Sequence, residues 1–202
     1  TPPVAWLAAR LRFFRRHMPC FGKAARRNGL RRRGLLAAAL AAAVVRERYP
    51  REAMMSAFRI LGEGQLSLTK FLLVTDTPQT LPDFPRLLSH ILARFKPETD
   101  LYVFSNLSMD TLDYTGPEVN KGSKGVLLGL GDAVRELPCE WVDDPPPGSH
   151  GPVVFCPGCL VLGGPSYRDA PDFAEKVAAD ESLKRWPLVV LCDHPERCAA
   201  SD

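Results

Sequence analysis

A short run of glycine, lysine and serine is the first candidate for chemistry in this chain. It reads Asn120-Lys121-Gly122-Ser123-Lys124-Gly125. Glycines let backbone amides approach an anion closely, while lysine and serine add positive charge and a hydroxyl donor. The segment is therefore a candidate phosphate-binding loop. Its spacing is not that of a Walker loop, which has more widely separated glycines followed by Lys-Ser/Thr, so a polar turn into a strand is the competing interpretation.

Cysteines provide the second candidate. Cys156 and Cys159 have the spacing at which two thiolates can reach one zinc ion, and Cys192, His194 and Cys198 follow later in the chain. Cys192 and Cys198 do not repeat that spacing, and Cys192 ends an apolar run where a small buried hydrophobe is ordinary. We therefore expect structural cysteines and no metal site, with zinc binding and a redox pair as alternatives.

Acidic residues and histidines are the remaining candidates for acid-base chemistry or metal binding. Strand ends and turns are also where aspartate is common for structural reasons. The histidines are scattered, and none stands beside a serine or cysteine nucleophile in a recognisable setting. We expect structural roles for this set: Asp76, Asp110, Asp113, Asp143, Asp144, His17, His90, His150 and His194.

The elements around these residues are clearest between residues 71 and 104. Residues 71–76 form a short apolar run typical of a buried strand. An amphipathic helix follows, capped by Asp83 or Thr80 and followed by Pro97. Its apolar positions are Phe84, Leu87, Leu88, Ile91, Leu92 and Phe95. Residues 101–104 give another strand, so the pattern predicts a strand-helix-strand crossover with a parallel strand pair.

The rest of the chain continues the alternation of strands and helices. Met54, Ala57, Phe58 and Leu61 have helical spacing within residues 51–61. Further strands are expected over residues 125–130, 153–155, 160–162 and 188–192, with a helix over residues 172–180 and a loop or joint at residues 145–148. Strands that are apolar on both faces need helices on both sides. We therefore predict an α/β fold, layered α/β/α with a mixed, largely parallel sheet.

Charge divides the chain into two parts. Residues 1–50 hold 12 Lys or Arg against one acid, Glu47, whereas residues 51–202 hold 14 basic and 22 acidic residues. The basic part is rich in alanine and arginine and does not begin with Met. A targeting peptide, a surface for anionic lipid or nucleic acid, a solvated helix, and translation of a GC-rich gene in a shifted frame are the interpretations considered. We favour the shifted frame.

Compartment and partners follow from what the sequence lacks. The longest apolar run covers residues 35–45, which is shorter than the roughly 18 to 20 residues of a membrane span. Six irregularly spaced cysteines do not form a disulfide scaffold. We expect a soluble cytoplasmic protein with no transmembrane segment. The sequence carries no groove-reading motif or stacking platform, so nucleic acid is not an expected partner.

Several segments, in one consistent order, resemble the C-terminal domain of the UbiD family of decarboxylases. The resemblance covers roughly residues 44–131 and is weaker beyond, where it is closest to the menaquinone branch that uses the futalosine route. Residues 1–43 do not resemble the family. The segments are Val45-Arg46-Glu47-Arg48-Tyr49-Pro50, Gly64-Gln65-Leu66-Ser67-Leu68-Thr69-Lys70, the strand ending at Asp76, Ala93-Arg94-Phe95-Lys96-Pro97-Glu98-Thr99-Asp100, Leu112-Asp113-Tyr114 and Gly122-Ser123-Lys124-Gly125.

This resemblance implies non-oxidative, reversible decarboxylation of an aromatic or α,β-unsaturated acid, in menaquinone or ubiquinone biosynthesis. It implies prenylated FMN, made by a partner flavin prenyltransferase, as the electron sink, and a divalent metal such as manganese. The family's catalytic and metal-binding residues lie in an upstream domain, so no catalytic or metal-binding position carries over. Intact members are expected to be homo-oligomers.

One functional position does carry over from the family. The lysine of its Gly-Ser-Lys segment reaches the flavin phosphate, which assigns Lys124 to cofactor binding, with Gly122 and Ser123 beside it. The chain departs from many members directly afterwards, where it reads Val126-Leu127-Leu128-Gly129-Leu130-Gly131. The substrate is therefore left open.

Two functional hypotheses follow. In the first, residues 44–202 are a UbiD-like C-terminal domain, incomplete at its C-terminus and inactive alone, and residues 1–43 are non-native or disordered. In the second, the chain is a non-enzymatic α/β binding or assembly module whose basic N-terminus contacts a polyanion.

Overall fold

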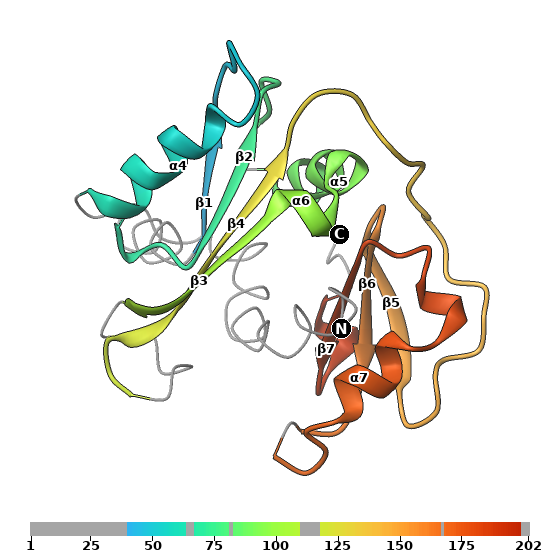
Figure 1. Cartoon of the computed structure of the whole chain (residues 1–202). Coiled ribbons are helices and arrows are strands. Elements are labelled where there is room, and N and C mark those ends of the chain that lie inside the picture. The colour runs from blue at the N-terminus through green and yellow to red at the C-terminus, as the bar shows by residue number, and fades with distance from the viewer. Residues whose placement is uncertain (1–39, 64–66, 81–82, 110–117, 167, 199–202) are drawn as a thin grey trace, which may run out of the picture. The chain divides into compact units, whose positions relative to one another are not determined.

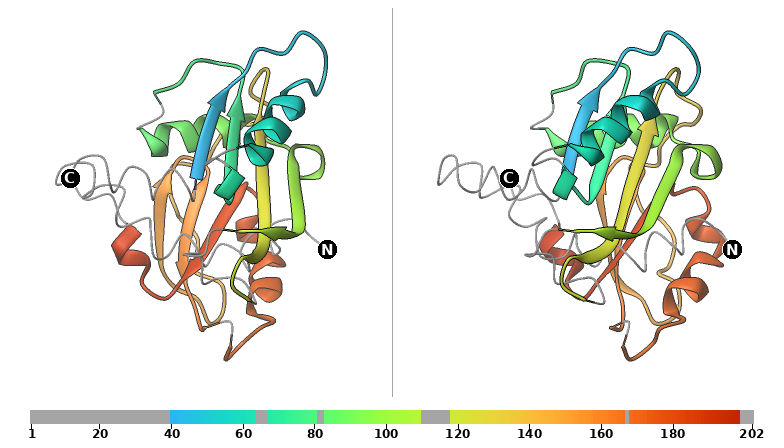
Figure 2. Two further views of the ribbon diagram at one scale, coloured as in Figure 1. Left: turned by 90° about the vertical axis from the view of Figure 1, so that its left-hand side faces the viewer. Right: turned by 60° about the vertical axis from the view of Figure 1, so that its left-hand side comes forward.

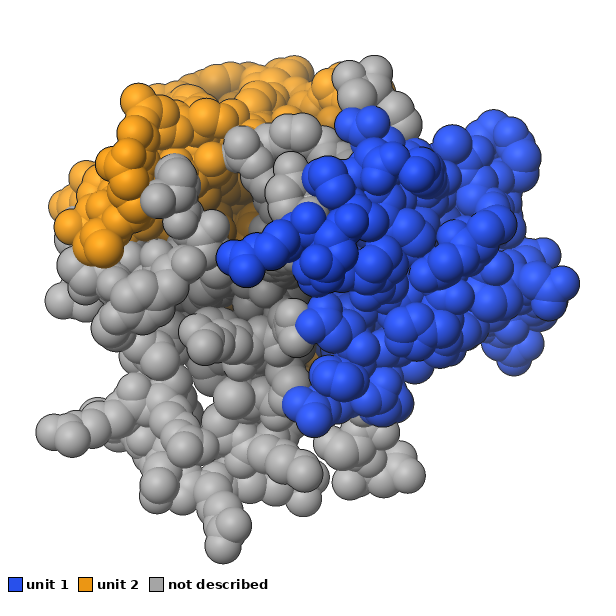
Figure 3. All heavy atoms as spheres, turned by 90° about the horizontal axis from the view of Figure 1, so that it is seen from below, with its two compact units in different colours: residues 1–27, 135–202 blue, residues 28–134 orange. Residues whose placement is uncertain are grey.

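The computed structural model describes residues 40–63, 67–80, 83–109, 118–166 and 168–198. These residues divide into two compact units. The one that ends at Val134, orange in Figure 3, is called the first unit here, and the one that begins at Arg135, blue in Figure 3, is called the second unit. The division precedes the proline run at residues 145–148, which belongs to the second unit.

The first unit is built on a mixed sheet. Its described strands are β1 (Leu40–Val44), β2 (Phe71–Thr75), β3 (Leu101–Ser108) and β4 (Lys121–Gly129). They are arranged in the order β1-β2-β4-β3, with β1, β2 and β4 parallel and β3 antiparallel to β4. The predicted mixed, largely parallel sheet is therefore confirmed.

Strand β4 separates β2 from β3, so the predicted parallel pairing of residues 71–76 with residues 101–104 is wrong. Val126, Leu127 and Leu128 of β4 are buried on both faces of the sheet. By contrast, the last four residues of β3 are exposed. A strand that is apolar on both faces gains most at the centre of a sheet, which explains why β4 takes the position beside β2.

Helices cover both faces of this sheet (Figures 1 and 2). On one face, α4 (Ala53–Gly62) packs Met54 and Ala57 against β2 and β4. On the other face, α5 (Phe84–Arg94) lies so close to β4 that a Cβ added to Gly129 would lie 2.7 Å from the Ile91 Cα. The layered α/β/α prediction is confirmed for this unit.

Helix α5 matches its predicted pattern closely. All six apolar positions predicted from its periodicity are buried, between 0% and 3% exposed. The Asp83 carboxylate accepts a hydrogen bond from the Arg86 amide at 3.3 Å and so caps the helix. Pro97 does more than follow the helix, because it begins a second short helix, α6 (Pro97–Asp100).

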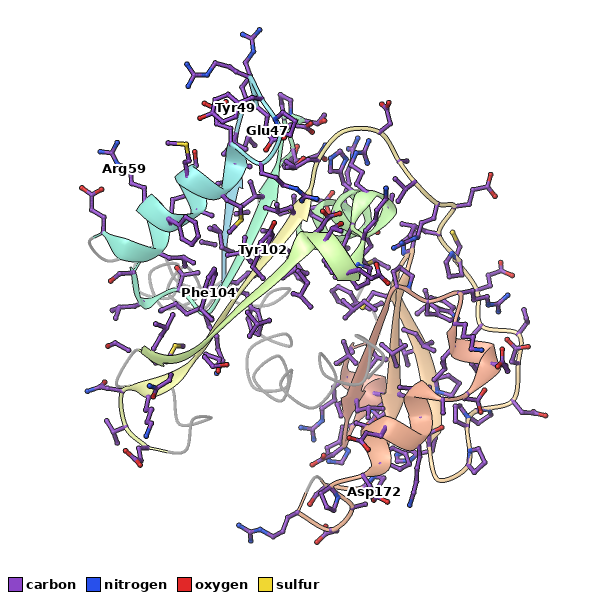
Figure 4. The ribbon with its side chains drawn as sticks, in the orientation of Figure 1. Glu47, Tyr49, Arg59, Tyr102, Phe104 and Asp172 are labelled. Carbon is purple, nitrogen blue, oxygen red and sulfur yellow. The ribbon has the colours of Figure 1, made fainter. Side chains whose placement is uncertain are left out.

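One predicted core position of α4 lies at the surface. Phe58 is 56% exposed, although Leu61 is partly buried against the core. The Phe58 ring meets the Phe104 ring of β3 edge-on at 5.7 Å, and Figure 4 shows Phe104 and Tyr102 on the α4 side of β3. The helical position of Phe58 is next to the buried stripe of α4, so its ring packs at the margin of that stripe.

Strand β1 crosses the domain boundary expected at residue 44. Its residues pair with β2 from Leu40 opposite Phe71 to Val44 opposite Thr75. The last part of the alanine-rich segment therefore belongs to the sheet.

Strand β3 contains an irregularity near its end. Its register with β4 shifts between Ser105 and Leu107, and the residue between them, Asn106, has a φ of 57°. This is the two-against-one pattern of a β-bulge.

The second unit contains a smaller sheet. Its described strands are β5 (His150–Cys156), β6 (Cys159–Gly163) and β7 (Leu188–Cys192), in that order, with β5 antiparallel and β7 parallel to β6. Helix α7 (Phe173–Ala178) and the 3₁₀ turns η3 (Glu181–Leu183) and η4 (Pro195–Cys198) accompany it. The fully buried Trp186 lies in its core beside Leu160 and Val189. The three strands and α7 confirm the sequence predictions.

The close approach of α5 to β4 gives a test of the layered packing. Gly129→Ala is expected to lower the free energy of unfolding by about 1–3 kcal/mol, because the new methyl group would overlap Ile91. Gly62→Ala at the end of α4 is the matched control, since it meets nothing within 4 Å. Urea denaturation measures both changes, and equal midpoints for the two variants would contradict the packing.

Candidate functional site

The segment predicted as a phosphate loop is the first half of strand β4. Gly122 pairs with Leu107 and Lys124 pairs with Phe104 of β3. An added Cβ on Gly122 would lie 2.5 Å from the Met109 Cγ, and one on Gly125 would lie 3.1 Å from the Phe71 ring. These glycines therefore make room for neighbouring side chains. The segment is a strand and not the expected loop, whereas its binding of an anion stays a prediction.

The three predicted cofactor residues do not share one face of the strand. Successive side chains of a strand point to opposite faces, so Gly122 and Lys124 face one way and Ser123 faces the other. Lys124 lies on the face that carries Val126 and Leu128, which pack toward α4. Within this strand, Lys124 is therefore the main candidate for binding an anion.

Lys124 is held rigidly inside the first unit. It is 4% exposed, and its Nζ donates to the Ser67 carbonyl at 2.6 Å and to the Thr69 carbonyl at 3.1 Å. Burying an ammonium group is costly unless it is hydrogen-bonded, and these carbonyls meet that need. The side chain consequently ties the segment before β2 to the central strand.

This arrangement can stabilise an anion by charge. A positive charge in a poorly solvated position interacts more strongly with a nearby anion than the same charge in water. Hydrogen bonds to the Ser67 and Thr69 carbonyls fix the position of the ammonium group. Binding of a phosphate by Lys124, with Gly122 and Ser123 beside it, stays a prediction.

Asp76 has a structural role at the carboxyl end of β2. Its Oδ2 accepts a hydrogen bond from the Gly131 amide at 2.7 Å, and Arg94 Nε donates to the Gly131 carbonyl at 2.8 Å. Gly131 has a φ of 70°, which favours glycine. The two side chains thus fasten the turn that follows β4, as the structural interpretation of Asp76 predicted.

His90 is part of a polar network that the sequence did not reveal. Its Nδ1 lies 3.1 Å from the Gln79 side-chain amide nitrogen, and its Nε2 lies 2.9 Å from the Thr75 hydroxyl. Because the amide nitrogen is a donor, Nδ1 accepts and Nε2 donates to Thr75. Burial, and then the nearby Arg94, lower the pKa of His90. The ring is therefore held neutral, as an orienting group between α5 and β2.

The five described cysteines all lie in the second unit as free thiols. No group of three or more His, Cys, Asp or Glu residues within the described ranges is placed to hold a metal ion, so the zinc alternative gains no support there. Cys156 lies opposite Cys159 across the β5-β6 turn, whereas Cys192 ends β7 and Cys198 ends η4. Cys20 lies outside the described residues.

Several other candidates lie outside the described residues as well. These are Asp110, Asp113 and His17, and also residues 1–39, on which a polyanion-binding surface would depend. Among the described candidates, Asp143 accepts from Arg185 at 3.1 Å, an exposed ion pair of a structural kind. No described helix is long and apolar enough to cross a membrane.

The segment around Glu47 organises the start of α4. Glu47 Oε1 accepts a hydrogen bond from the Ala53 amide at 2.9 Å, and Glu52 accepts from the Arg48 amide at 2.7 Å. Figure 4 shows Glu47 and Tyr49 at the end of the sheet where α4 begins. First-turn amides of a helix need such acceptors, so this part of the motif serves the fold.

Comparison with known sequences places these features in a family. Residues 33–129 match the family described as the 3-octaprenyl-4-hydroxybenzoate carboxy-lyase C-terminal domain, UbiD_C. They are a UbiD C-terminal domain. The match begins ahead of the resemblance noted over residues 44–131 and includes strand β1, so part of the segment expected to lie outside the family lies inside it.

Relatives of this UbiD domain extend the similarity into the second unit. A protein of Chlamydia caviae is 48% identical over 163 residues, which are 81% of this chain and 28% of the relative. A Chlamydia pneumoniae protein, named as a subunit of 4-hydroxybenzoate decarboxylase, is 49% identical over 156 residues, 77% of this chain and 26% of the relative. The chain therefore spans about a quarter of the length of these relatives.

Two solved structures are similar over part of the chain. One is the closed form of a vanillic acid decarboxylase from Sedimentibacter hydroxybenzoicus, with 20% identity, a TM-score of 0.41, and coverage of 53% of this chain and 23% of that one. The other is a UbiD-class enzyme, HmfF, from Pelotomaculum thermopropionicum in complex with FMN, with 15% identity, a TM-score of 0.41, and coverage of 46% and 20%.

The buried lysine of the UbiD domain gives a direct stability test. Lys124→Met is expected to lower the free energy of unfolding by about 1–3 kcal/mol, because the Ser67 and Thr69 carbonyls lose their donor. The control is Lys121→Met on the same strand. The Lys121 side chain is exposed and makes one ion pair, with Glu118 at 3.6 Å, so this change should alter stability by less than about 1 kcal/mol. Urea denaturation distinguishes them, and equal losses would refute the structural role of Lys124.

The neutral state of His90 predicts a pH dependence. The unfolded chain binds a proton near the ordinary pKa of 6.5, whereas the folded protein binds it only at lower pH. Between the lower folded-state pKa and about pH 6.5 the unfolded state holds more protons, so stability should fall as the pH drops below about 6.5 and level off below the folded-state pKa. His90→Gln should lose this slope in urea denaturation across the interval. A slope that survives the substitution would assign it to another group.

Proposed function

We propose that this chain is part of a UbiD-type decarboxylase that removes carbon dioxide, without oxidation and reversibly, from an aromatic or α,β-unsaturated acid. The observation that carries this proposal is the 49% identity, over 77% of the chain, to the Chlamydia pneumoniae protein named as part of a 4-hydroxybenzoate decarboxylase. The UbiD C-terminal domain at residues 33–129 supports it. Reactions in menaquinone or ubiquinone biosynthesis supply acids of this class.

The cofactor of the intact enzyme is prenylated FMN, supplied by a partner flavin prenyltransferase. When bound, this flavin accepts electron density from the substrate as carbon dioxide leaves. In this chain, Lys124 is the residue that would hold the flavin phosphate, through its buried charge. Gly122 leaves the space beside Lys124 that Met109 fills. Ser123 lies on the opposite face of the strand, so its hydroxyl would bind the phosphate only from that face.

Catalysis requires residues that this domain does not supply. The acid-base residues and the ligands of a divalent metal such as manganese belong to a domain outside the matched part, because this chain spans about a quarter of the length of its relatives. The domain's contribution is to support the phosphate and to build a homo-oligomer in the cytoplasm. By itself the chain is inactive.

A chimera tests the proposal. The homologous segment of the Chlamydia pneumoniae relative would be replaced by residues 33–198 of this chain, and decarboxylation of 4-hydroxybenzoate measured with prenylated FMN. Activity within about tenfold of the unmodified relative is expected, because the exchanged part positions the cofactor and does not carry the reacting groups. The isolated 202-residue chain should give no turnover with a panel of aromatic acids.

Variants in the chimera separate cofactor support from folding. Lys124→Met should reduce bound flavin, measured by absorbance after gel filtration, by at least about tenfold, the effect of losing one charged contact. Lys121→Met should leave flavin content unchanged. A folded chimera without activity, turnover by the isolated chain, or full flavin content in Lys124→Met would each count against the corresponding part of the proposal.

A further inference from the structure

The chain passes from the first unit to the second through a segment whose near end is fastened to α5. The Gly131 amide donates to the Asp76 carboxylate at 2.7 Å, and the Val134 amide donates to the Ala93 carbonyl of α5 at 2.8 Å. Val134 is also the last residue of the first unit. The backbone is therefore held by the first unit as far as this residue.

The far end of this segment is fastened to the second unit shortly afterwards. The Pro138 carbonyl accepts a hydrogen bond from the Gly158 amide in the β5-β6 turn at 2.9 Å. A Cβ added to Gly158 would lie 2.7 Å from the Leu137 Cδ2, so the Leu137 side chain packs closely on that turn. The two residues between these anchors are Arg135 and Glu136.

Residues 137–148, here called the strap, stay on the second unit although they form no helix or strand. The Trp141 ring packs beside the fully buried Trp186, with ring centroids 6.2 Å apart. At the end of the strap, a Cβ added to Gly148 would lie 3.2 Å from the Phe173 ring of α7. The strap is thus held at its start, middle and end, so it belongs mechanically to the second unit.

We propose that Arg135 and Glu136 are a hinge about which the second unit, carrying the strap with it, rotates as a rigid body relative to the first. Hinges between packed bodies are a few loop residues whose φ and ψ absorb the change. Because contacts on both sides fix the flanking backbone, such a change falls on these two residues. Two residues span about 7 Å at most, so the motion is a rotation and not a separation of the units. This inference is independent of the proposed decarboxylase function.

The proline run inside the strap is the competing place for a joint. Proline restricts φ to a narrow range, and proline-rich segments act as semi-rigid spacers. Pro146 is buried, and its carbonyl accepts a hydrogen bond from the Ser149 amide at 2.9 Å, which closes a turn. These features stiffen the run, so a change of direction there is less favourable than one at Arg135 and Glu136.

Distance distributions between pairs of spin labels test the hinge in the full chain. The labels are attached to p-acetylphenylalanine in place of Met55 in α4, Val142 in the strap or Lys184 after η3, all of which have exposed side chains. Pulsed electron paramagnetic resonance should give a distribution for the 55–142 pair at least about twice as wide as that for the 142–184 pair. The reverse order would place the joint in the proline run, and equal widths would show that no motion is confined to the hinge; either result overturns the proposal.

Variants of the hinge provide a second measurement on the same label pairs. Arg135→Gly with Glu136→Gly should widen the 55–142 distribution, because glycine allows more values of φ, whereas Arg135→Pro with Glu136→Pro should narrow it. Cys139→Gly with Glu140→Gly, at two exposed residues of the strap, is the matched control and should leave the width unchanged. An unchanged width in the glycine variant of the hinge would overturn the proposal, whether or not the proline variant folds.

Discussion

The fold of the first unit depends on how the buried charge of Lys124 is accommodated. Lys124 stands in the central strand of the sheet, where an unpaired ammonium group would be strongly destabilising. Its hydrogen bonds to the Ser67 and Thr69 carbonyls satisfy it and fix the chain that enters β2. The Gly125 amide donates to the Lys70 carbonyl immediately beside them, at 2.8 Å. The parallel pairing of β2 with β4 therefore begins beside these hydrogen bonds and continues through apolar residues.

Local pattern was sufficient to predict most of the elements. The periodicity of α5 identified its buried positions because the helix packs one continuous stripe against a sheet. Strand pairing was not predictable in the same way, because the order β1-β2-β4-β3 arises from competition between strands distant in sequence. Apolar residues on both faces of β4 were visible in the sequence, and they are the signal that would have placed this strand between β2 and β3.

The candidate site was only partly accessible from residue types. The sequence predicts Gly122 and Gly125 as loop glycines. Glycine also occurs in strands where a neighbouring side chain needs the space, and Met109 and Phe71 occupy it here. Lys124 was assigned through resemblance to a family, since an isolated lysine in a strand carries no sign of its burial. The network of His90 with Thr75 and Gln79 joins three separate segments and could not be read from spacing alone.

The bulge in β3 has a consequence for self-association. Among the described strands, β3 pairs with β4 alone, so its other side presents backbone amides and carbonyls of the kind that recruit a second chain into an amyloid-like ladder. The left-handed backbone at Asn106 interrupts that row of groups and twists the strand away from a straight template. A β-bulge of this kind is one of the devices that keep edge strands from pairing with another chain.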